Sequence, residues 1–131
     1  MMLARTFRLA AVALAALAFS PMTIVPAKAQ GALLDQYVAF IGPADHFNSR
    51  GQRLTQPWQI LRQDRANYHR FGIRDAGDQY DGYFGSAENR ARMERMIRNG
   101  YINANAARRI VNGNVWVRVE IYRNAVNVTV E

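Results

Sequence analysis

The chain has 131 residues, of which 17 are lysine or arginine and 10 are aspartate or glutamate, and it contains no cysteine. This length fits a single domain with one modest core. The missing cysteine excludes disulfide bonds, a lipoprotein anchor and a cysteine nucleophile.

The first 29 residues have the three regions of a cleavable export signal. Arg5 and Arg8 precede an apolar or small-residue run over 9–19, which is much shorter than the roughly 20 residues of a membrane-spanning helix. Residues 27–29 (AKA) match a signal-peptidase cleavage pattern. We therefore expect an exported domain over 30–131, periplasmic in a Gram-negative cell, with no transmembrane segment after cleavage.

Every basic residue after the signal is an arginine. Three positive charges lie within the signal, so its removal lowers the net charge from +7 to +4. This moderate charge and the export signal argue against nucleic acid as a partner. Arginine suits bidentate pairing with carboxylates or phosphates, and we expect a protein partner or an anionic envelope component.

Apolar periodicity and capping residues predict four short helices along the middle of the chain. The second has Pro57 in its first turn and ends before Gly72, where a left-handed glycine is expected. In the third, Arg90, Glu94 and Arg98 are spaced to pair along the polar face. The predicted helices run from Ala32 to Ile41, from Thr55 to Phe71, from Ser86 to Asn99 and from Asn103 to Val111.

The C-terminal part of the chain changes to a period of two. Residues 114–122 and 126–130 alternate between apolar and polar side chains, and Arg123 and Asn124 lie between these segments. This pattern predicts an antiparallel β-hairpin with one buried face of valine and isoleucine. Two strands alone are marginally stable, so we expect an α+β domain in which the hairpin packs on the helices.

Asp64 is the most informative polar residue. On a helical projection it lies among the apolar side chains of the second helix, where an isolated carboxylate is costly to bury. We expect it to form a structural network with Arg53 or Arg74, or to accept backbone N–H groups of the preceding loop. The alternative is a general acid or base with a shifted pKa.

The two histidines, His69 and His46, are the remaining candidates for acid–base chemistry. If the loop that carries His46 folds over the second helix, both rings converge with Asp64 to form an acid–base or metal-binding set. Their spacing matches no diagnostic motif, so ordinary surface histidines are the alternative interpretation.

Asp75, Asp78 and Asp81 are spaced by three in a glycine-rich loop. Flexible, oxygen-rich loops bind calcium, although this spacing is not that of an EF-hand. The calcium-stabilised module predicted here requires the three carboxylates to point at one centre. An ordinary solvated loop is the alternative, and no other cofactor is expected.

Trp116, Arg118 and Tyr122 share the face of the hairpin opposite the valines. Exposed, they form an aromatic and arginine patch of the kind enriched at binding hot spots. The alternative is that a helix covers them and both faces of the hairpin belong to the core.

The sequence contains no catalytic signature such as a nucleophile elbow or a P-loop. We therefore expect a non-enzymatic exported domain that binds a protein or an anionic envelope component. The alternatives are a small hydrolase or lyase for an envelope polymer, with Asp64 and His69 or His46 as acid–base groups, and the calcium-stabilised module.

Overall fold

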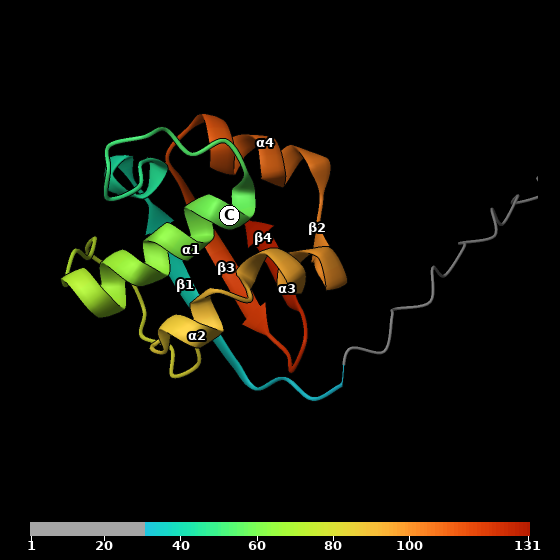
Figure 1. Cartoon of the computed structure of the whole chain (residues 1–131). Helices are drawn as coiled ribbons and strands as arrows, with labels where there is room; N and C mark the ends of the chain where they lie inside the picture. The colour runs from blue at the N-terminus through green and yellow to red at the C-terminus, as the bar shows by residue number, and fades with distance from the viewer. Residues whose placement is uncertain (1–30) are drawn as a thin grey trace, which may run out of the picture.

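The helices and strands of residues 31–131, which the computed structural model describes, form two layers. Figure 1 shows the helices over one face of a single sheet, which confirms the α+β class. The predicted signal over 1–29 lies outside the described residues. Within 31–131, no helix has the length and apolar character needed to cross a bilayer.

The sheet contains four strands in the order β1-β3-β4-β2. β3 and β4 form the predicted antiparallel hairpin, and β1 pairs antiparallel with the other edge of β3, whereas the short β2 lies parallel to β4. The strands are β1 (Asp35–Ile41), β2 (Tyr101–Ile102), β3 (Val115–Ile121) and β4 (Val126–Val130).

The first predicted helix is wrong, because most of that segment is strand β1. Tyr37, Ala39 and Ile41 are fully buried and alternate with Val38 and Phe40, which lie on the other face. A short apolar segment is compatible with the period of a helix or with that of a strand. The segment becomes a strand because the open edge of β3 supplies partners for its backbone hydrogen bonds.

The other predicted helices are present, with changes at their ends. Helix α1 begins at Pro57 and continues into a π-helical turn, η2, that ends at Gly72 in the expected left-handed conformation. The third predicted helix breaks into α2 and α3 near Ala91. The segments are η1 (Pro43–His46), α1 (Pro57–Ala66), η2 (Asn67–Phe71), α2 (Ala87–Arg90), α3 (Met93–Asn99) and α4 (Ala104–Asn112).

The predicted apolar face of the hairpin forms the core with α1, α3 and α4. Val117, Val119 and Ile121 are fully buried against the helical layer. The free edge of β1 is covered by the loop that follows η2, because Gln79 exchanges hydrogen bonds with Val38 on that edge. The sheet is thus protected on this side from pairing with another chain.

Gly100 joins α3 to β2 where the backbone approaches β4. A Cβ atom at this position would lie on the carbonyl group of Val126, so we expect Gly100→Ala to lower the free energy of unfolding by about 1–3 kcal/mol or more. Gly113→Ala is the matched control, because its nearest new contact is 3.9 Å away and its φ of −162° suits any residue. Urea unfolding checks both, and equal midpoints for the two variants would contradict the close approach.

Candidate functional site

A buried ionic network joins α1, η2 and the loop before α2. The guanidinium group of Arg65 is fully buried, and its Nε donates to Asp64 at 2.7 Å. Its Nη1 donates to Asp81 at 3.0 Å and to the carbonyl oxygen of Gln79 at 3.0 Å. Both carboxylates therefore have hydrogen-bonded partners inside the protein and are not open to a ligand.

The partner of Asp64 is Arg65, and not Arg53 or Arg74 as the sequence suggested. Arg53 donates to the carbonyl oxygen of Val111 and stacks on Phe47. Arg74 donates to the Tyr68 carbonyl oxygen and lies over the ring of the same residue. The adjacent position on the helix was overlooked, although a helical projection places Arg65 beside the apolar residues that flank Asp64.

Burial raises the pKa of Asp64 to about 7, and the positive charge of Arg65 opposes this rise. The pKa alone would suit a general acid or base near neutral pH. The geometry does not, because Asp64 is 2% exposed and lies against Arg65. The condition for acid–base chemistry, an open pocket shared with both histidines, is not met in residues 31–131.

The two histidines lie in different places. His69 Nε2 contacts Asp81 at 2.9 Å, so it is connected to Asp64 only through Asp81 and Arg65. His46 is buried with its two ring nitrogens each 2.9 Å from a carbonyl oxygen, of Gly42 and of Ile110. Through these two contacts it connects η1 to α4.

The three loop aspartates do not converge. Asp81 is fully buried in the ionic network, whereas Asp78 accepts the backbone N–H groups of Phe40 and Asp75, each at 2.8 Å. In the described part of the chain, no group of three or more histidine, aspartate or glutamate side chains is arranged to hold a metal ion. The loop instead joins the edge of β1 to the network.

Trp116, Arg118 and Tyr122 lie on the face of the sheet opposite the helices. Trp116 is 37% exposed and packs on Phe40, with ring centroids 5.3 Å apart. Arg118 is exposed but forms a two-pronged ion pair with Glu131, at 2.7 and 3.0 Å. The patch exists, and its arginine already has a carboxylate partner.

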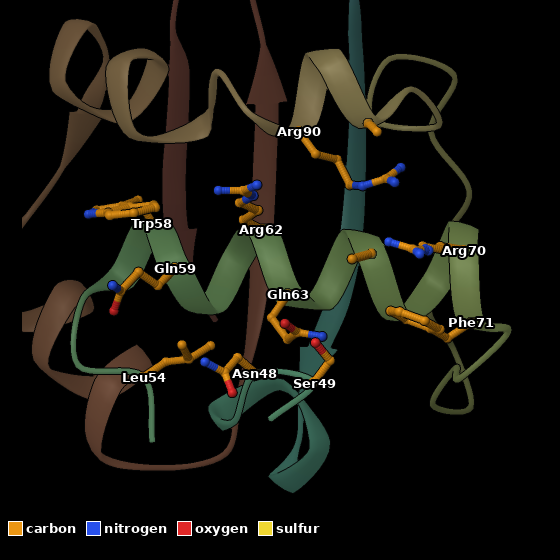
Figure 2. Close-up of a pocket in the computed structure, with 12 residues that line it drawn as sticks. Asn48, Ser49, Leu54, Trp58, Gln59, Arg62, Gln63, Arg70, Phe71 and Arg90 are labelled. Carbon is orange, nitrogen blue, oxygen red and sulfur yellow. The ribbon is translucent and has the colours of Figure 1, made fainter. Parts of the chain in front are cut away.

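A cleft along the outer side of α1 was not predicted, and it has the properties of a binding site. Its volume is about 360 Å³, near the lower end of the roughly 300–1,000 Å³ typical of small-molecule pockets. Figure 2 shows Trp58, Arg62 and Arg70 along one row of α1 and η2, with Arg90 opposite on α2. The lining residues are Asn48, Ser49, Leu54, Trp58, Gln59, Arg62, Gln63, Ala66, Arg70, Phe71, Ala87 and Arg90.

All the charged side chains that line the cleft are arginines. Arg62, Arg70 and Arg90 line it together with neutral side chains and no carboxylate. Among the ion pairs within residues 31–131, none involves these three guanidinium groups. Burial lowers the pKa of Arg90, and so does repulsion from Arg70 and Arg62, with Asp81 partly offsetting both. An anion in the cleft would relieve this repulsion.

Arg90 is held in position before any ligand binds. It is only 7% exposed, and its Nη1 donates to the carbonyl oxygens of Phe84 at 2.8 Å and Gly85 at 3.0 Å. The predicted pairing with Glu94 does not form, because the chain breaks between α2 and α3, and Glu94 pairs with Arg98 instead. This break leaves Arg90 free to face α1.

The π-helical turn η2 completes the cleft. Phe71, the last residue of the predicted second helix, is 46% exposed and lines the cleft beside Arg70. A π turn has more residues than an α turn and rotates the residues that follow it, and such turns are frequent at functional sites. The signal for the cleft in the sequence was the gathering of glutamine and arginine on the polar face of the second predicted helix, at Gln59, Arg62, Gln63 and Arg70.

Arg65→Met should lower the free energy of unfolding by about 3–5 kcal/mol, because it leaves two buried carboxylates without their cation. Arg62→Met on the same helix is the control and should change stability by about 0.5 kcal/mol or less, since Arg62 is exposed. Urea unfolding of both variants measures the difference. Equal stability of the two would show that the network contributes nothing.

Asp64→Asn tests the raised pKa. The folded state binds an extra proton between the ordinary pKa of 3.8 and about 7, so the stability contributed by protonated Asp64 is lost as the pH rises through this window. We expect wild type to lose on the order of a few kcal/mol relative to Asp64→Asn between pH 4 and pH 8. Urea unfolding across this range measures the effect, and a relative gain with pH would mean that Arg65 outweighs burial.

Comparisons with known proteins give no relative for this chain. No family model matches it. The searches of curated proteins and of solved structures gave no match either. Its function is therefore inferred from its own residues, and above all from the arginine-lined cleft.

Proposed function

We propose that this protein is an exported, non-enzymatic binding domain that holds an anionic group of an envelope component in the cleft along α1. The observation that carries the proposal is the convergence of Arg62, Arg70 and Arg90 on one cleft without a carboxylate. Guanidinium groups pair with phosphate or carboxylate through two parallel hydrogen bonds. Three of them around one space suit a multiply charged or bridging anion.

The surrounding side chains add neutral donors and flat surfaces. Asn48, Gln59 and Gln63 line the cleft with amide groups that can donate to anionic oxygens. Figure 2 shows these amides on the side of α1 away from Arg62, so a ligand in the cleft can be contacted from both sides. Trp58 and Phe71 lie toward opposite ends of the row and supply apolar contact area.

The hydrolase or lyase alternative has less support. Its acid–base candidates, Asp64 and His69, are tied to Arg65 and Asp81 in the buried network and line no part of the cleft. His46 lies between two backbone carbonyl oxygens. Binding of an anion, in contrast, requires only the guanidinium and amide groups that line the cleft.

Arg62→Gln and Arg70→Gln test the proposal by isothermal titration with pyrophosphate and, separately, with citrate. Each variant removes one charged hydrogen-bonding group, and we expect affinity to fall about tenfold or more for whichever anion binds. Binding should also weaken as salt is added, because both side chains are exposed.

Arg123→Gln is the matched control for this experiment. Arg123 is also exposed but lies in the turn between β3 and β4, outside the cleft. Its replacement changes the net charge equally and should leave affinity nearly unchanged. The proposal fails if wild type binds neither anion, or if Arg123→Gln weakens binding as much as Arg62→Gln does.

A further inference from the structure

A second, apolar groove adjoins the arginine-lined cleft. Its volume is about 250 Å³, and its apolar lining comes from Ala44, Phe47, Phe71 and Ile73. Phe47, Phe71 and Ile73 are 40%, 46% and 53% exposed, which is unusual for three large apolar side chains gathered in one place.

The groove and the cleft are neighbours that share part of their lining. Asn48, Ser49, Gln63 and Phe71 line both of them. In Figure 2, Phe71 lies directly below Arg70, and Ser49 lies below Gln63. The guanidinium group of Arg70 lies over the ring of Phe71, 5.0 Å from its centroid, so a molecule whose charged end lies at Arg70 can extend along Phe71 toward the groove.

The groove differs from the cleft in charge. No charged residue lines it, and its polar contribution comes from Asn48, Ser49, Gln63 and Asn67. Asn67 is itself engaged, because its side-chain amide donates to Asp45 at 2.9 Å. The two neighbouring compartments thus offer opposite chemistry, with guanidinium groups in the cleft and apolar side chains in the groove.

We propose that the natural ligand is an anionic amphiphile, bound as a single molecule. Its phosphate or carboxylate group lies among Arg62, Arg70 and Arg90, and its alkyl or acyl chain lies between Phe47, Phe71 and Ile73. This inference rests on the proposed function, because the anionic end determines the orientation. Charge complementarity at the cleft is the reason to choose an anionic amphiphile over a neutral apolar partner.

Isothermal titration with inorganic phosphate and with ethyl, butyl and hexyl phosphate, all below their micellar concentrations, tests the inference. Each methylene that enters the groove should raise the affinity about twofold to fourfold. Hexanol at the same concentration should bind far more weakly, because it lacks the anionic group.

Ile73→Ser is the discriminating variant. Ile73 lines the groove but not the cleft, whereas Phe71 lines both and would confound the result. We expect Ile73→Ser to weaken the binding of hexyl phosphate about threefold to tenfold and to leave the affinity for inorganic phosphate unchanged. Leu33→Ser removes an equally exposed apolar side chain outside the groove and is the control, which should bind like wild type.

The outcomes separate this inference from the proposed function. Phosphate binding that does not strengthen with chain length overturns the amphiphile and leaves the anion cleft intact. Undiminished binding of hexyl phosphate by the double variant Arg62→Gln/Arg70→Gln, or binding of hexanol as tight as that of hexyl phosphate, overturns both. Binding to phosphatidylglycerol vesicles without binding of monomeric hexyl phosphate also overturns the inference, and would indicate contact with a membrane surface instead.

Discussion

The structure depends on one buried cation, the guanidinium group of Arg65. A charge removed from water is tolerated only when it is paired and hydrogen-bonded. Two of the guanidinium nitrogens of Arg65 donate to Asp64 on its own helix and to Asp81 and a carbonyl oxygen in the following loop, whereas its buried Nη2 has no hydrogen-bond partner. The rings of Tyr37 and Tyr68 lie over the guanidinium group, with centroids 3.9 and 4.6 Å from its central carbon. Through these contacts it connects α1, η2, the loop and β1.

This arrangement also determines what remains on the outer side of α1. Asp64 and Asp81 pair with Arg65 on the inner side of α1. Glu94 pairs with Arg98, beyond the break in the third predicted helix. No carboxylate is left to face Arg62 from within the cleft. The carboxylates of this part of the chain are therefore paired on the inner side of α1, while the outer side of the same helix keeps an excess of positive charge.

Features governed by local chemistry could be predicted from the sequence. The alternation of the last two strands, the glycine after η2 and the cap residues Ser86 and Asn103 all act within a few residues, and each is confirmed. Features decided by distant contacts could not be predicted. β1 is a strand because β3 offers it an edge, and the rotation that exposes Phe71 comes from a π turn.

The candidate site is one of the features that depend on distant contacts and could not be predicted from the sequence. Unpaired arginines are common on this surface, so exposed charge alone does not identify a site. Arg90 differs because it is nearly buried, carries no ion pair and is held by two carbonyl oxygens, which means that its conformational entropy is already lost before a ligand arrives. This can be recognised only once the fold shows which carboxylates are engaged elsewhere. Arg90 is repelled by Arg62 and Arg70, and this repulsion is relieved when an anion binds among the three guanidinium groups.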